Sequence, residues 1–176
     1  YKLEKDVIDA EIEIMKEMGV EIKTGVEVGK DVTLADLRKD GYKAFYVAVG
    51  CSGGRYPNVP NDRADGTTTA VEFLKKANTG NCSFDDQTVV VGGANVAIDA
   101  ARVSARSGAK KVTMLCLESK DIMPATKEEI KEAEEDGVEI KCGWGPKEVI
   151  VENGKATAIV FKKCTRVFDE NKKFSP

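Results

Sequence analysis

A short glycine-rich segment at residues 92–97 constrains the fold of this chain more than any other feature. It reads Gly-Gly-Ala-Asn-Val-Ala and lies between an apolar run, residues 88–91, and a segment with helical periodicity, residues 95–107. A glycine-rich turn between a strand and a helix opens a parallel α/β unit. The free N–H groups and the positive dipole end of such a helix face an anion. The segment therefore predicts a phosphate-binding turn in an α/β protein.

The residues of this turn are expected to play different parts in a Rossmann-type dinucleotide site. Gly92 permits the tight turn, and the small side chain of Ala97 lets helix and strand pack closely. In the pattern G-x-G-x-x-A the third residue is glycine, so that the backbone can touch the pyrophosphate, but this chain has Ala94 there. A turn that no longer binds a nucleotide is therefore the alternative. The residues expected to cradle a pyrophosphate are Gly92, Gly93, Asn95 and Val96.

A second candidate element lies at the end of the next predicted strand. In this fold, an acidic residue about 20 positions beyond the turn binds the ribose hydroxyls. Glu118 lies 21 residues after Ala97 and directly follows the strand-like run 111–117. A carboxylate there accepts hydrogen bonds from a free 2′-hydroxyl and repels a 2′-phosphate, which favours NAD over NADP. Ser119 and Lys120 complete the candidate segment, and the Lys120 ammonium could instead attract a 2′-phosphate. A solvated loop is the alternative interpretation.

Helical and strand-like segments alternate along most of the chain. Helices are predicted for residues 5–18, 33–39, 69–78, 95–107 and 126–136. Those at 33, 69 and 126 begin with a threonine followed three residues later by Asp or Glu, which predicts a capping box. Strands are predicted for residues 20–22, 44–50, 88–91, 111–117, 138–141, 147–151 and 156–163, with a hairpin turn at residues 152–155. The run 44–50 is apolar throughout, which is typical of a strand buried on both faces. We therefore expect an α/β fold, a Rossmann-like parallel sheet flanked by helices, with a smaller antiparallel hairpin near the C-terminus.

One sequence pattern occurs twice, each time at a predicted junction between a helix and the following strand. Residues 17–23 read Glu-Met-Gly-Val-Glu-Ile-Lys, and residues 135–141 read Glu-Asp-Gly-Val-Glu-Ile-Lys. The recurrence predicts two Rossmann units, with chance similarity as the alternative. In the second unit the turn at Gly92 precedes Gly137 by 45 residues. The same count back from Gly19 falls before residue 1, so the turn of the first unit would lie outside this sequence.

Composition and charge exclude several classes of function. The net charge is −3 with interleaved signs, which argues against nucleic acid, and no apolar run is long enough for a membrane span. The chain has no histidine, which excludes Ser-His and Cys-His catalysis. Its five cysteines form no CxxC pair, which argues against a zinc site or a disulfide framework and fits a reducing cytoplasm. We expect Cys51 and Cys116 to have packing roles, and we expect no catalytic side chain.

With these motifs in place, the chain resembles the small subunit of glutamate synthase and its NAD(P)H-dependent flavoprotein relatives. The likeness runs through residues 3–25, 48–50, 88–102 and 123–125, in the family's order. In that family a nicotinamide domain is inserted within an FAD domain, and electrons pass from NAD(P)H through FAD to iron–sulfur clusters. The resemblance implies part of an FAD domain at 1–50, a crossing linker at 51–66, a nicotinamide domain at 67–164 and a truncated return segment at 165–176.

Three departures from the family pattern bear on function. Ala94 replaces a glycine, Leu117 and Glu118 stand where the family has arginines for the NADP 2′-phosphate, and Gly54-Arg55 replaces a Pro-Arg pair. The FAD fingerprint is absent, so we expect FAD in the parent enzyme but not in this chain, which would be inactive alone. The implied partners are the missing FAD-domain halves, and iron–sulfur domains or a large glutamate synthase subunit. A degenerate scaffold for subunit docking is the alternative.

Overall fold

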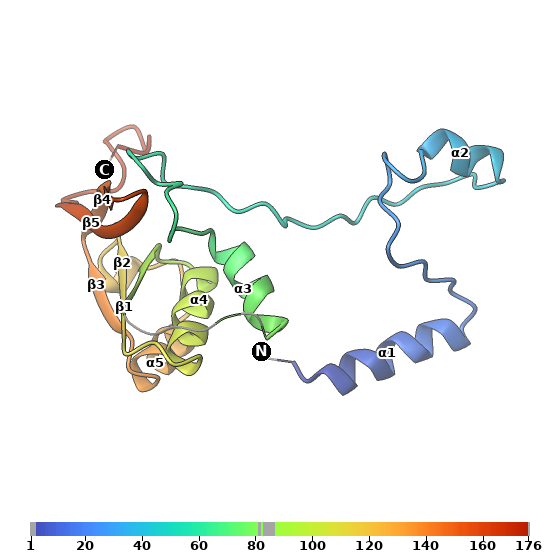
Figure 1. Cartoon of the computed structure of the whole chain (residues 1–176), viewed down its shortest axis with the longest axis horizontal. Coiled ribbons are helices and arrows are strands. Elements are labelled where there is room, and N and C mark those ends of the chain that lie inside the picture. Colours follow the sequence, from blue (N-terminus) through green and yellow to red (C-terminus); the bar gives the residue numbers. More distant parts are fainter. Residues whose placement is uncertain (1–2, 81, 83–86, 176) are drawn as a thin grey trace. The chain divides into compact units, whose positions relative to one another are not determined.

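The computed structural model describes residues 3–80, 82 and 87–175, and the chain divides into two compact units, 1–50 and 51–176. The second unit carries the sheet (Figure 1). Its parallel strands are β1 (Gln87–Val91), β2 (Lys111–Cys116) and β3 (Glu139–Cys142), in the order β1-β2-β3. Helix α4 (Asn95–Arg106) connects β1 to β2, and α5 (Lys127–Glu135) precedes β3. The predicted α/β class with a parallel sheet is confirmed.

The main core lies between one face of this sheet and the helices α4 and α5. Alternate residues of β2 point to this face, which is why Val112, Met114 and Cys116 are all buried. They pack with residues of the two helices, among them Ile98 and Ile130. Burying a side chain of this size stabilises the fold by about 1.5–3 kcal/mol. A second cluster joins α4 to α3 (Ala70–Asn78) through Phe73 and Val103, and the two helices lie side by side (Figure 1).

A buried ion-pair cluster ties α4 to α5. Arg102 lies on α4, and only 6% of its surface is exposed. Its Nε donates to Asp136 Oδ2 at 2.7 Å, and its Nη1 pairs with Glu132 and, at 3.7 Å, with Glu129 Oε2. Arg106, one turn further along α4, makes two further hydrogen bonds to Asp136. Arg102 is thus a structural ion-pair residue that joins the two helices.

The predicted antiparallel hairpin is also confirmed, and it lies against residues 60–65. Strands β4 (Trp144–Glu152) and β5 (Lys155–Lys163) pair around a turn in which Asn153 and Gly154 both have positive φ. The N–H of Val149 donates to Pro60 O at 3.0 Å, and the Asn61 side-chain amide donates to Val149 O at 3.0 Å. These bonds attach the end of the predicted linker to the hairpin.

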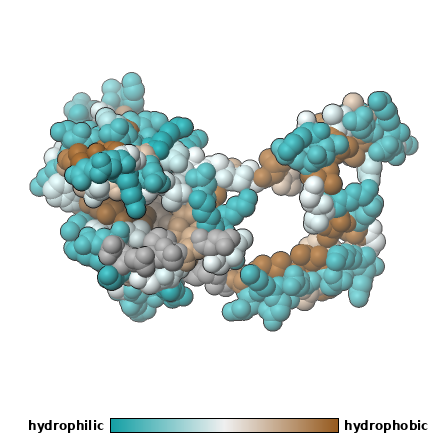
Figure 2. Space-filling view, viewed as in Figure 1, coloured by the Kyte–Doolittle hydropathy of each residue, from teal (hydrophilic) through white to brown (hydrophobic). Residues whose placement is uncertain are grey.

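The first unit contains helices α1 (Lys5–Glu17) and α2 (Leu34–Lys39), and neither has a buried residue. Thr33 and Asp36 form the predicted capping box, as do Thr69 and Glu72 at α3 in the other unit. Apolar patches interrupt the otherwise hydrophilic surface of the first unit (Figure 2). Its exposed apolar side chains include Val7, Ile8, Ile14, Met15, Val20, Ile22, Val26 and Val28. Such a surface is typical of a region that packs against other protein.

Two strand predictions in this unit are wrong. Residues 20–22 and 44–50 have no regular secondary structure, and Tyr46 is 94% exposed. The apolar run 44–50 has the composition of a buried strand, but a strand also needs neighbours for its N–H and C=O groups. Among the described residues of this unit, pairing is limited to an isolated bridge between Val28 and Val32. The apolar composition of residues 44–50 indicated that this segment prefers to be buried, whereas forming a strand requires a neighbouring strand to pair with.

Candidate nucleotide-binding site

The glycine-rich turn joins β1 directly to α4 and is held against β2. The N–H of Gly92 donates to Leu115 O at 2.9 Å. Gly92 has φ 143°, a conformation that side chains rarely adopt, and a Cβ added there would lie 3.2 Å from Ala97 Cβ. Both features are those expected of the first glycine and the small sixth residue of a Rossmann turn. The turn therefore has the local geometry that the sequence predicted.

The N-terminus of α4 is open to solvent at this turn. Ala94 is the N-cap residue, with extended φ and ψ of −96° and 170°, and no side chain caps the helix. Helices α2, α3 and α5, by contrast, each begin with a threonine whose hydroxyl accepts a backbone hydrogen bond. The N–H of Ala97 donates to Ala94 O at 2.9 Å, whereas the N–H groups of Asn95 and Val96, at the very start of the helix, point toward an anion-binding position. Ala94, Asn95 and Val96 are all exposed.

Glu118 lies close to this turn. Gly93 is buried, and a Cβ added to it would lie 2.9 Å from Glu118 Oε2 and 3.0 Å from Cys116 Cβ. The missing side chain of Gly93 thus makes room for the carboxylate that follows β2. The structure therefore brings together the turn and the acidic residue, which are far apart in sequence. Sequence reasoning assigned Gly93 only to phosphate binding and missed its contact with Glu118.

The loop after β2 forms hydrogen bonds to the turn. The N–H of Ala125 donates to Gly93 O at 3.0 Å, and the N–H of Thr126 donates to Asn95 Oδ1 at 3.0 Å. Asn95 was predicted only as a backbone donor, so this side-chain role was missed. The sequence signal for this contact was the Met-Pro-Ala segment, residues 123–125, which directly precedes Thr126.

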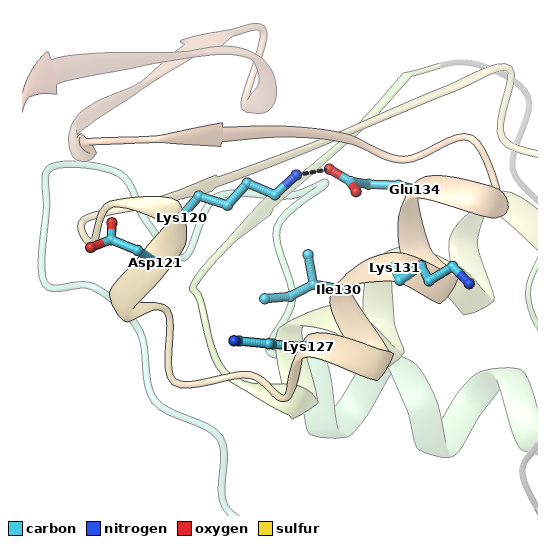
Figure 3. A pocket seen from close by; sticks show the side chains of 6 residues that line it. All are labelled: Lys120, Asp121, Lys127, Ile130, Lys131 and Glu134. Atoms are coloured by element: carbon cyan, nitrogen blue, oxygen red, sulfur yellow. Dashed lines mark hydrogen bonds and ion pairs between the residues drawn. The ribbon is translucent and has the colours of Figure 1, made fainter.

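Ser119 and Lys120 lie on the outer side of this loop. Ser119 is exposed and precedes a short 3₁₀ helix, η1 (Lys120–Ile122). Next to it, between η1 and α5, is an open hollow of about 450 Å³ (Figure 3). Six residues line it: Lys120, Asp121, Lys127, Ile130, Lys131 and Glu134. The ammonium of Lys120 forms a solvent-exposed ion pair with Glu134 (Figure 3).

Cys116 lies beneath the turn as a protonated thiol. Burial, reinforced by the neighbouring Cys142, raises the pKa of Cys116 to about 12. A thiol with so high a pKa is not a nucleophile at neutral pH. The predicted packing role of Cys116 is therefore confirmed. Cys51, at the start of the second unit, is exposed, so the packing role predicted for it is wrong.

Comparison with known proteins identifies the family. The profile of the family described as pyridine nucleotide-disulphide oxidoreductase matches residues 5–172. Among curated proteins, the glutamate synthase [NADPH] small chain of Escherichia coli (strain K12) is 37% identical over 173 residues, covering 90% of this chain and 36% of the relative. The NADP(+)-dependent formate dehydrogenase subunit beta of Moorella thermoacetica is 34% identical over 171 residues, covering 95% of this chain and 24% of that protein.

Two further comparisons show relatives with different names and a shared fold. The NAD-dependent dihydropyrimidine dehydrogenase subunit PreT of Escherichia coli (strain K12) is 36% identical over 159 residues, covering 89% of this chain and 37% of the relative. The structure of Mycobacterium tuberculosis FprA in complex with NADPH matches with a TM-score of 0.68 at 17% identity, over 85% of this chain and 49% of FprA. The chain thus spans well under half the length of these curated relatives. No helix in the described part of the chain is long and apolar enough to cross a membrane. Since the family profile matches nearly the whole chain, the chain belongs to the pyridine nucleotide-disulphide oxidoreductase family.

Proposed function

We propose that this chain is the nicotinamide-dinucleotide-binding portion of an NAD(P)H-dependent flavoprotein oxidoreductase, and that it prefers NAD(H). The observation that carries the proposal is the contact between the Glu118 carboxylate and the Gly93 turn. In such an enzyme the nicotinamide supplies a hydride to FAD, from which electrons pass on to iron–sulfur centres. In this reaction, the present chain would bind the dinucleotide and orient it.

The first part of the argument concerns the pyrophosphate. The open first turn of α4 offers N–H groups and the positive end of the helix dipole at Ala94, Asn95 and Val96. The left-handed Gly92 and its close approach to Ala97 bring the chain around tightly enough to present these groups. The bonds from Ala125 and Thr126 hold the turn in place, so little ordering is needed when a nucleotide binds.

The second part concerns the ribose. Relatives of this chain have names that specify either NADPH or NAD, so family membership leaves the preference open. A carboxylate at Glu118 accepts hydrogen bonds from a free 2′-hydroxyl and repels a 2′-phosphate. A hydrogen bond to a charged group contributes about 1.5–3 kcal/mol, or roughly 10- to 150-fold in affinity. The cation that could offset this, Lys120, is paired with Glu134. The balance therefore favours NAD(H).

The third part concerns the rest of the enzyme. The relatives are named as small or beta chains of oxidoreductases, and this chain matches only a fraction of each. The exposed apolar side chains and the unpaired run 44–50 of the first unit fit a piece of a larger FAD-binding domain. We infer that residues 1–50 complete their packing against FAD-domain segments of the longer protein, and that this protein works in the cytoplasm with iron–sulfur partners.

Calorimetric titration of the purified chain with NADH and NADPH tests the proposal. We expect tighter binding of NADH, and we expect Glu118→Arg to reverse the order. Glu152→Arg makes the same change of charge on the exposed end of the hairpin and should leave the order unchanged. Equal affinities, or a preference for NADPH in the unmodified chain, would end the assignment of Glu118. Binding of neither dinucleotide would favour the degenerate docking scaffold.

A further inference from the structure

Three sulfur atoms meet at the carboxyl ends of β2 and β3. Cys116 and Cys142 are direct partners in the parallel register of these strands, and their Sγ atoms are 3.7 Å apart. Met123, from the loop after η1, places its Sδ 3.8 Å from Cys142 Sγ. Cys116 is 2% exposed and Met123 8%, whereas Cys142 is half-buried. The group is therefore enclosed by the core and open only on the side of Cys142.

We propose that Cys116, Cys142 and Met123 bind one soft monovalent metal ion of the Cu(I) class. Two thiols and a thioether are the donors that such ions select over imidazole and carboxylate. The two cysteines supply two thiolates, and Met123 supplies the third sulfur through its contact with Cys142. This site lies directly beneath the turn, but the proposal does not depend on the nucleotide-binding role proposed above.

The separations of Cys142 Sγ from the other two sulfurs match those around a three-coordinate ion. Metal–thiolate bonds are about 2.3 Å long, and three sulfurs arranged around one ion at that distance lie about 4 Å from one another. The two measured separations, 3.7 and 3.8 Å, are close to this value. The ion could therefore enter with small side-chain rotations and no change in the strand register.

A disulfide fits the same three atoms less well. It would require the two Sγ atoms to approach to about 2.05 Å and would need an oxidant. A disulfide between Cys116 and Cys142 would also not involve the Met123 sulfur. Metal binding needs no electron transfer, because the copper stays in the Cu⁺ state. One Cu⁺ replaces the two thiol protons, which pass to solvent, and it is then bound by both thiolates and the neutral thioether.

The complex would carry one net negative charge, which the nearby Glu118 carboxylate opposes and the N-terminus of α4 favours. Cys116 Cβ lies 3.0 Å from where a Cβ of Gly93 would stand, and the chain continues from Gly93 into the N-terminus of α4. The positive end of the helix dipole is therefore close to the site. The exposed edge of Cys142 supplies the route of entry.

The test uses the full chain with Cys51, Cys82 and Cys164 changed to serine, which leaves Cys116 and Cys142 as its two thiols. Cu(I) is supplied under anaerobic, reducing conditions in competition with a chromogenic Cu(I) chelator. We expect one equivalent to bind, with ultraviolet thiolate-to-copper absorption and release of protons. Cys142→Ala should lose this equivalent, and Met123→Leu should weaken it. Met15→Leu, at an exposed position of α1, is the matched control and should not change it.

Two outcomes would overturn the proposal. One is a folded parent protein, verified by circular dichroism, that takes no Cu(I) from the chelator. The other is Cu(I) binding that survives Cys142→Ala unchanged. Should a variant fail to fold, X-ray absorption of the copper-loaded parent protein decides instead. Three sulfur neighbours at about 2.3 Å support the site, and nitrogen or oxygen neighbours contradict it.

Discussion

The carboxylate of Glu118 lies against the backbone of Gly93, with Oε2 2.9 Å from the point where a Cβ of residue 93 would stand. This contact joins the end of β2 to the turn after β1, two segments that the parallel register places side by side. It explains why position 93 is occupied by a residue without a side chain, even though its φ is not in the left-handed region. It also makes the turn and the ribose-binding candidate parts of one surface.

Gly93→Ala should therefore disturb dinucleotide binding. The new methyl would meet Glu118 Oε2 and Cys116 Cβ at 3.0 Å or less, so the carboxylate or the turn must shift. Overpacking of this kind costs about 1–3 kcal/mol, and we expect roughly a 5- to 150-fold weaker Kd for NADH. Gly53→Ala is the matched control, since a Cβ there would meet nothing within 4 Å. Unchanged affinity in Gly93→Ala would show that the contact does not shape the site.

Ala94→Gly should tighten dinucleotide binding if the methyl obstructs the pyrophosphate. Ala94 is exposed and has ordinary extended dihedral angles, so glycine would relieve no backbone strain. Any gain must come from closer approach of the ligand, and it should not exceed a few kcal/mol for one contact. Glycine is also the better N-cap residue, so the melting temperature should not fall. Calorimetry that shows equal or weaker binding would place the obstacle elsewhere.

Arg102→Leu should destabilise the second unit strongly. It leaves the carboxylates of Asp136, Glu132 and Glu129 without their buried cation. Loss of one member of a buried ion-pair cluster costs about 3 kcal/mol or more. Arg106→Leu is the control: Arg106 is exposed and pairs with the same Asp136, so its loss should cost less than about 1 kcal/mol. Urea denaturation measures both, and equal effects would contradict the special role of the buried guanidinium.

The same cluster predicts how stability depends on pH. Burial alone would raise the pKa of Asp136, but hydrogen bonds from Arg106 and Arg102 outweigh it and hold the pKa below the ordinary value of 3.8. A lowered folded-state pKa contributes stability that is present above the unfolded-state pKa and is lost as the pH falls through the folded-state value. The melting temperature should therefore drop below about pH 4. Asp136→Asn should flatten this part of the pH profile, and an unchanged profile would assign the acid sensitivity to other groups.

The purified chain should be colourless and unable to oxidise NADH by itself. The sequence contains no second glycine-rich fingerprint that could hold FAD. The visible absorption spectrum and an NADH oxidation assay with an artificial electron acceptor measure this. Copurified flavin with its yellow absorption would show that residues 1–50 and 51–176 suffice to bind FAD, and would contradict the expectation.

The sequence alone determined the features that depend on neighbours along the chain. The threonine caps at Thr33 and Thr69, the Asn153-Gly154 hairpin and the turn at Gly92 were all predicted, because each depends on the dihedral preferences or side-chain hydrogen bonds of a few consecutive residues. Hydrophobic periodicity likewise placed most helices and strands of the second unit to within one residue at each end, although β4 begins three residues earlier than predicted.

Tertiary structure decided what depends on distant partners. The run 44–50 has the composition of a buried strand, but strand pairing requires a neighbouring strand, which no local pattern supplies. The contact of Glu118 with Gly93, the pairing of Lys120 with Glu134 and the bond from Thr126 to Asn95 each join residues 14 or more positions apart. They exist because parallel strands bring their carboxyl ends to one edge of the sheet. The sequence thus named the candidate residues, whereas the folded sheet decided which of them meet.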